Sequence, residues 1–158
     1  METANLVLVS SDNQKIEIDT ESAQKSILLK GLMSDFNAQQ EPIQLPDIKY
    51  DILKKVVEYL TYYKDKTPKD IPKPMPSSNL NEVIDEWDVN FINSIELDNV
   101  FDLINVANYM DIPSLLDLSC AKIASLMKGK TAQEIRTMFN IECDLTEEEL
   151  KEYEEYQI

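Results

Sequence analysis

The sequence predicts an α+β fold in which a small β-sheet is followed by many helices. Two short segments near the N-terminus have the character of strands: the first is a short apolar run, and the second alternates apolar with charged residues. Over most of the remaining chain, apolar residues recur at helical spacing, and no repeat of solenoid length is present. The length of 158 residues is sufficient for one domain with a substantial core.

The predicted sheet begins with a hairpin. Residues 5–10 and 15–19 form its strands, because Ile16 and Ile18 alternate with charged residues, and residues 11–14 supply the turn. Residues 42–46, Pro-Ile-Gln-Leu-Pro, predict a short extended piece that proline restricts at both ends.

Helices are predicted on both sides of a proline-rich loop. Residues 22–36 carry an apolar stripe, and residues 47–63 place five apolar side chains on one face: Ile52, Leu53, Val56, Val57 and Leu60. Residues 64–86 hold four of the seven prolines within nine positions, which predicts an exposed, mobile loop inserted in the domain. Further helices follow at residues 87–95, 98–110 and 113–127.

The C-terminal part carries local start and stop signals for helices. Gly129 suits the end of the helix that precedes it. Thr131 with Glu134, and Thr146 with Glu149, have the spacing of a capping box, so a helix is expected to begin at each place. Residues 142–158 form an acidic tail with eight acidic residues and one lysine.

Composition excludes most catalytic chemistry. The chain has no histidine, one arginine, two glycines 98 positions apart and a formal net charge of −15. These counts argue against His-dependent catalysis, a His-ligated zinc site and glycine-rich phosphate loops, and the charge argues against nucleic acid and anionic membranes as partners. No signal peptide or membrane span is predicted, so the expected location is inside the cell. Cys120 and Cys143 are expected to be reduced and to pack as small apolar residues.

Two neighbouring helices carry unusually many apolar residues. Eight of the eleven residues from 100 to 110 are apolar, as are nine of the fourteen from 114 to 127. Such helices either lie wholly in the core or leave an apolar face that a partner protein covers. The pattern alone leaves both alternatives open.

Several runs resemble the S-phase-kinase-associated (Skp) adaptors of SCF (Skp–cullin–F-box) ubiquitin ligases. They are Asn-Tyr-Met-Asp-Ile at 108–112, Leu-Leu-Asp at 115–117, Lys-Gly-Lys-Thr at 128–131, Glu-Ile-Arg at 134–136 and Phe-Asn-Ile at 139–141. The resemblance covers roughly residues 5–147. It implies a POZ (BTB-type) domain over residues 1–127, including the loop at 64–86, and a helical F-box-binding extension with the acidic tail over residues 128–158.

The resemblance also implies a function without chemistry: an adaptor, not an enzyme, that needs no cofactor or metal and bridges a cullin scaffold to F-box substrate receptors in the cytoplasm and nucleus. Its cullin-facing residues map to Asn108 and Tyr109. Its F-box-facing residues map to Leu116, Cys120, Ile123, Ile135, Phe139, Asn140 and Ile141. The surplus apolar surface is also suited to self-association when no partner is bound.

Three departures from the family pattern leave room for other functions. Residues 64–86 carry four lysines where members are often strongly acidic, position 147 is Glu where some members have a modified proline, and the chain ends in tyrosines where the family usually has a clamping helix with a tryptophan. The shortened end motivates an alternative, an F-box-binding structural subunit of a cullin-independent complex such as a kinetochore assembly. A carboxylate-dependent enzyme has only the acidic excess in its favour.

Overall fold

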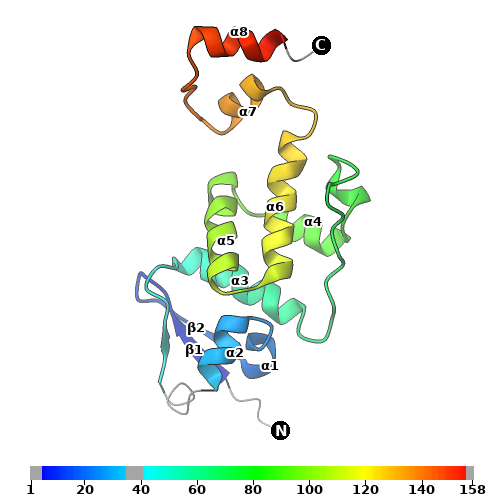
Figure 1. Ribbon diagram of the computed structural model, residues 1–158. Coiled ribbons are helices and arrows are strands. Elements are labelled where there is room, and N and C mark those ends of the chain that lie inside the picture. Colours follow the sequence, from blue (N-terminus) through cyan, green and yellow to red (C-terminus); the bar gives the residue numbers. More distant parts are fainter. Residues whose placement is uncertain (1–4, 35–40, 156–158) are drawn as a thin grey trace.

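The computed structural model describes residues 5–34 and 41–155. A small sheet lies at one end of the molecule, two long helices stand side by side in the middle, and the helices of the C-terminal segment lie at the opposite end (Figure 1). The predicted α+β fold is confirmed.

The sheet contains the predicted hairpin and one further strand. Strands β1 (Asn5–Val9) and β2 (Lys15–Asp19) pair antiparallel, so that Leu6 opposes Ile18 and Leu8 opposes Ile16. The expected extended piece at 42–46 contains β3 (Ile43–Gln44), which pairs parallel with β1 and completes the order β2-β1-β3. Because parallel pairing joins segments distant along the chain, the local sequence could predict the extended backbone but not its partner.

The single helix predicted over residues 22–36 is wrong, because the structure has two short helices there. They are α1 (Thr20–Ala23) and α2 (Ile27–Met33), and residues 35 and 36 lie outside the described part of the chain. Ser26 separates them: its hydroxyl accepts a hydrogen bond from the Leu29 N–H at 3.2 Å and donates one to the Met110 carbonyl at 2.6 Å. An N-cap that is also bonded to a distant segment therefore starts a new helix in the middle of the apolar stripe.

Helix α3 (Tyr50–Tyr62) confirms the helix predicted at 47–63, and four of the five apolar side chains predicted to share one face are buried. The exposed loop predicted over residues 64–86 is only partly correct. Residues 64–79 are irregular and run beside the C-terminal half of the fold (Figure 1), but Leu80, Val83 and Ile84 are buried. These three side chains hold the short helix η1 (Leu80–Glu82) and the residues after it against the helices that follow in the chain. The exposed segment therefore ends earlier than predicted.

Helices α4 (Glu86–Asn93), α5 (Leu97–Tyr109) and α6 (Pro113–Met127) follow, close to the predicted ranges. The α5 and α6 helices pack against each other and each buries one face, formed by Val100, Leu103, Val106 and Ala107 on α5 and by Leu115, Leu118, Ser119 and Ala121 on α6. Each therefore has a core face and an open face, which combines the two alternatives left by the sequence.

The C-terminal segment forms α7 (Ala132–Met138) and α8 (Glu147–Glu155). Gly129 has φ +77°, a left-handed conformation that ends α6. Thr131 and Glu134 form the predicted capping box, and Thr146 and Glu149 exchange the same pair of side-chain to backbone bonds. The helix starts predicted from local signals are thus confirmed.

Candidate protein-binding surfaces

The open face of α6 presents a line of apolar side chains. Leu116, Cys120, Ile123 and Met127 follow each other at i, i+4, i+7 and i+11, a spacing that places them along one side of a helix. Leu116 and Ile123 are half-buried, Cys120 is exposed and Met127 is 39% exposed. Three of the residues predicted to face an F-box are therefore brought together on α6.

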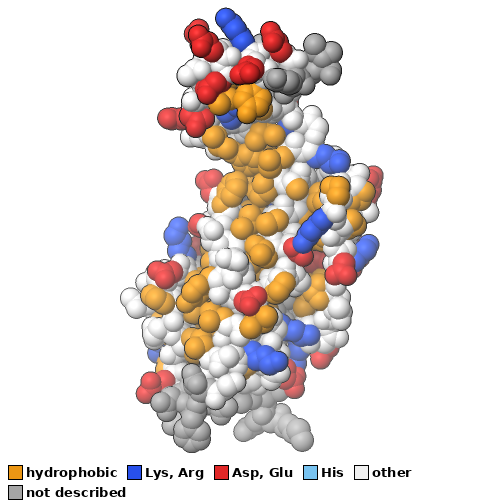
Figure 2. All heavy atoms as spheres, in the orientation of Figure 1, with side chains coloured by type: hydrophobic (Ala, Val, Ile, Leu, Met, Phe, Trp, Pro, Cys, Tyr) orange, Lys and Arg blue, Asp and Glu red, His pale blue; other side chains and the backbone are white. Residues whose placement is uncertain are grey.

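Aromatic side chains extend this line towards α5 and α7. Phe101 on α5 is 40% exposed, and its ring lies edge to face against Phe139, with centroids 5.6 Å apart and planes at 81°. Ile135 on α7 is half-buried like Phe139, and Ile141 after α7 is exposed. We call this surface, over α5, α6 and α7, the apolar band; hydrophobic side chains gather along it in Figure 2.

Phe101 was missed by the sequence analysis. Eight of the eleven residues around it are apolar, and their spacing does not separate those that point to the core from those that remain open. Its contact with Phe139 joins α5 to the C-terminal segment, and no local signal could have indicated that pairing.

Asn140 ends α7 in a left-handed conformation with φ +52°. The Ile141 N–H bonds to the Arg136 carbonyl at 2.8 Å, and the Asn140 N–H bonds to the Thr137 carbonyl at 3.4 Å, which is the Schellman arrangement. The backbone at Asn140 therefore turns the chain and leaves the Ile141 side chain exposed beside the end of α7.

A second surface lies where α5 meets α2. Asn108 and Tyr109 are both exposed, and Tyr109 is 52% exposed. Together with Ile27, Leu28, Gly31, Leu32 and Asp111, Tyr109 lines an open hollow. Ile27 is 57% exposed and forms the apolar edge of this surface, which we call the α2–α5 corner.

Backbone hydrogen bonds hold α2 against the end of α5. The N–H of Ile27 bonds to the Asp111 carbonyl at 3.1 Å, and that of Leu28 bonds to the Met110 carbonyl at 3.3 Å. The unpaired donors at the start of α2 thus satisfy carbonyls at the end of α5. This fixed junction places Ile27 beside Tyr109, a proximity that the sequence analysis did not predict.

The two surfaces lie apart on the molecule. Helix α2 lies next to the sheet, whereas α7 lies at the opposite end (Figure 1). The part of the apolar band on α7 therefore lies at the opposite end of the molecule from the α2–α5 corner.

The described residues offer little chemistry. Residues 5–34 and 41–155 contain no group of three or more metal-binding side chains, and no helix described there is long and apolar enough to span a membrane. Partial burial raises the pKa of the Cys120 thiol although the residue is exposed, and the nearby Asp117 carboxylate raises it further, which disfavours the reactive thiolate. The packing role expected for the two cysteines is wrong, because both are exposed and free.

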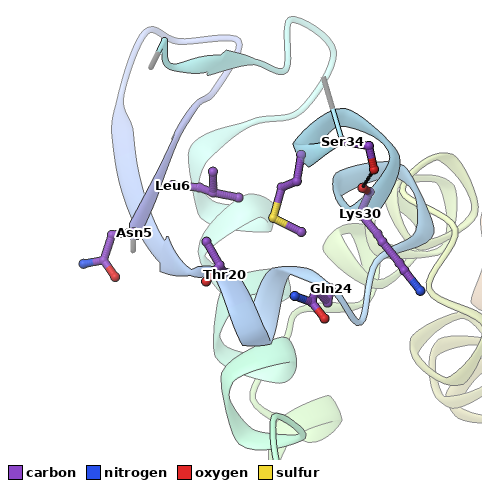
Figure 3. A pocket seen from close by; sticks show the side chains of 7 residues that line it. Asn5, Leu6, Thr20, Gln24, Lys30 and Ser34 are labelled. Carbon is purple, nitrogen blue, oxygen red and sulfur yellow. Dashed lines mark hydrogen bonds between the residues drawn. The ribbon is translucent and has the colours of Figure 1, made fainter. Parts of the chain in front are cut away.

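A second hollow lies between β1, α1 and α2 (Figure 3). Its polar lining consists of Asn5, Thr20, Gln24, Lys30 and Ser34. Figure 3 shows Lys30 directed away from Leu6, and among the described residues that line the hollow none is a carboxylate or a thiol. This composition provides neither a nucleophile with a base nor a set of metal ligands.

Comparison with known proteins identifies similar sequences over nearly the whole chain. A family model described as Skp1 family, tetramerisation domain, matches residues 4–65, and one described as Skp1 family, dimerisation domain, matches residues 113–157. The S-phase kinase-associated protein 1 homolog of Tetrahymena thermophila is 46% identical over 90% of this chain and 85% of its own. The E3 ubiquitin ligase complex SCF subunit sconC of Arthroderma benhamiae is 37% identical over 93% of this chain and 89% of its own, and that of Aspergillus flavus is 38% identical over 94% and 91%.

Proposed function

The chain belongs to the Skp1 family, and from this premise we propose that it is the adaptor subunit of an SCF-type E3 ubiquitin ligase. It bridges a cullin scaffold to F-box substrate receptors and so directs proteins to ubiquitin-dependent degradation. The observation that carries the proposal is the pair of separate apolar surfaces on one POZ-type chain.

The cullin-binding surface is the α2–α5 corner. Asn108 and Tyr109 are the contact residues, and the exposed side chain of Ile27 extends their surface. A tyrosine with an exposed ring and a polar tip suits an interface, because it supplies apolar area at a small cost in side-chain entropy. The junction between α2 and α5 supports this assignment because it holds the two sides of the surface in fixed positions.

The F-box-binding surface is the apolar band. Leu116, Cys120 and Ile123 contribute from α6, and Ile135, Phe139, Asn140 and Ile141 contribute from the C-terminal segment. The open apolar area supports this assignment, and Phe101 and Met127 belong to the same surface. An apolar area of this kind is typical of a surface that another protein covers.

The adaptor acts through proximity. A substrate held by the F-box receptor is kept near the ubiquitin-carrying enzyme held by the cullin, which raises their effective concentration. The chain itself supplies no catalytic group and needs no cofactor. The net charge of −15 supports the absence of nucleic-acid and anionic-membrane partners, and the proposed location is the cytoplasm and nucleus.

The test is capture of both partners by the full chain. We expect the purified protein to bind an F-box segment and a cullin N-terminal domain together, and the double variant Asn108→Lys/Tyr109→Lys to lose the cullin but keep the F-box. Circular dichroism of the variant controls for unfolding. Retention of the cullin by the folded variant would contradict the site, and failure of the wild type to bind a cullin would contradict the function.

Two further interactions are tested in the same experiment. An F-box segment bound without any cullin would favour the alternative of a cullin-independent structural subunit. Self-association through the surplus apolar surface of α5 and α6 would appear as a dimer that the F-box segment converts to a one-to-one complex.

A further inference from the structure

Residues 64–79, which we call the strap, are fastened along α6. Lys73 Nζ lies 2.6 Å from Asp117 Oδ1, and Lys128 Nζ donates a hydrogen bond to the Met75 carbonyl at 3.0 Å. Met75 and Ile71 are half-buried against the core, so the attachment is apolar as well as ionic. At its start the strap is held by Lys64, which bonds Asp19 at 3.2 Å and Glu21 at 2.8 Å.

The line of α6 that receives the strap is adjacent to the apolar band. Asp117 and Lys128 are eleven positions apart in the sequence. Leu116 and Met127, each of which directly precedes one of them, are also eleven positions apart. Each residue turns a helix by 100°, so the two lines run in parallel along neighbouring sides of α6. The strap is therefore attached to α6 at Asp117 and at Lys128, on the side next to the line of the apolar band.

The border formed by the strap is basic in a strongly acidic protein. The strap contains four lysines against Asp65 and Asp70. Lys64 is paired with Asp19 and Glu21, and Lys66 lies over the Tyr62 ring. The lysines that join the strap to α6 are Lys73 and, on the helix side, Lys128. The Lys73 side chain is 70% exposed despite its ion pair, and Lys128 is exposed and bonded to a neutral carbonyl. Basic side chains, drawn in blue, lie beside the hydrophobic band on the side of the strap in Figure 2. A partner that covers the band meets these ammonium groups at its flank.

We propose that the strap is a second wall of the F-box-binding surface and selects F-box segments whose docking helix carries acidic side chains along one flank. This inference rests on the proposed function. Charge complementarity identifies the occupant: apolar side chains of the F-box cover the band while its carboxylates lie opposite Lys73 and Lys128. Such pairs at the rim of an interface act mainly on selectivity and association rate.

The test uses the full chain and two F-box segments that differ only at one flank of the docking helix, which carries Asp and Glu in one and Lys in the other. We expect the acidic form to bind the wild type about tenfold more tightly at low salt, and this preference to shrink in high salt. Isothermal titration calorimetry at two salt concentrations measures both effects. Equal affinity for the two forms would overturn the inference.

The variant Lys73→Gln/Lys128→Gln removes two charges but keeps donors for Asp117 and Met75. It is expected to weaken the acidic form about three- to tenfold and to leave the basic form unchanged or tighter. Lys15→Gln/Lys25→Gln, with exposed lysines near the sheet, is the matched control and should change neither affinity by more than about twofold. Equal losses for both F-box forms in the strap variant would also overturn the inference. If neither form binds the wild type, the proposed function itself fails.

Discussion

The phenolic hydroxyl of Tyr63 lies 2.8 and 2.7 Å from the two carboxylate oxygens of Asp88, and both residues are buried. The bond joins the end of α3 to α4 beneath a cluster of aromatic rings. Trp87 stacks on Tyr62 with centroids 3.6 Å apart and on Phe91 at 5.1 Å. A buried carboxylate thus depends on one phenol, and α4 is fixed at the point where the chain returns from the strap.

Tyr63→Phe is expected to destabilise the protein by about 1–3 kcal/mol at neutral pH, because the Asp88 carboxylate stays buried without its donor. Burial raises the pKa of Asp88, whereas the Tyr63 hydroxyl lowers it, so the variant raises that pKa further. The variant then takes up a proton at a higher pH than the wild type. Its stability deficit should therefore shrink as the pH falls through the raised pKa of Asp88, above the usual 3.8.

Urea unfolding of both proteins at several pH values measures this deficit. Tyr62→Phe is the matched control, because it keeps a ring stacked on Trp87 and, within the described part of the chain, its hydroxyl makes no hydrogen bond. A deficit for Tyr63→Phe that grows towards acidic pH would show that the bond does not act on the ionised carboxylate.

Ser26→Ala is expected to cost about 1–3 kcal/mol, since it removes the N-cap of α2 and a buried hydrogen bond to the Met110 carbonyl. Thermal or urea unfolding measures the cost. Ser34→Ala is the control, because that hydroxyl bonds the Lys30 carbonyl at an exposed position, and we expect a change below about 0.5 kcal/mol. Similar losses for the two variants would argue against a special role of Ser26.

The contrast between Ser26 and Gly129 explains how much of the fold the sequence could predict. Gly129 and the pair Thr131 and Glu134 act within one helical turn, so their spacing alone predicted the end of α6 and the start of α7. Ser26 divides a helix because it reaches a carbonyl 84 residues away. Local periodicity contains no information about that contact, and it predicted one continuous helix.

The same distinction applies to the candidate surfaces. Leu116, Cys120 and Ile123 could be grouped from helical spacing, whereas the partnership of Phe101 with Phe139 depends on how α7 folds back. Leu80, Val83 and Ile84 were assigned to an exposed loop because three apolar residues next to a proline-rich run are too few to show a period. Tertiary packing, rather than propensity, decides the burial of such short anchors.

Asn140 allows backbone geometry to be separated from partner binding. Asn140→Gly should leave stability unchanged or raise it by up to about 1 kcal/mol, because glycine adopts the left-handed conformation without strain, whereas Asn140→Ala should lower it by about 1 kcal/mol. Urea unfolding measures both, and a gain from alanine would contradict the argument. If the Asn140 side chain contacts an F-box, the glycine variant loses affinity for the F-box segment while it keeps its stability.

Phe101→Ala tests whether the apolar band binds the F-box. The side chain is 40% exposed, so its removal should cost the free protein no more than about 1–2 kcal/mol, most of it from the lost contact with Phe139. In the complex a partner would bury the ring completely, and its loss should weaken binding of an F-box segment at least about tenfold. Ile27→Ala, at the α2–α5 corner, is the reciprocal control: it should weaken capture of the cullin domain and leave F-box affinity unchanged. An F-box affinity that responds to Ile27→Ala as strongly as to Phe101→Ala would mean that the two surfaces do not serve separate partners.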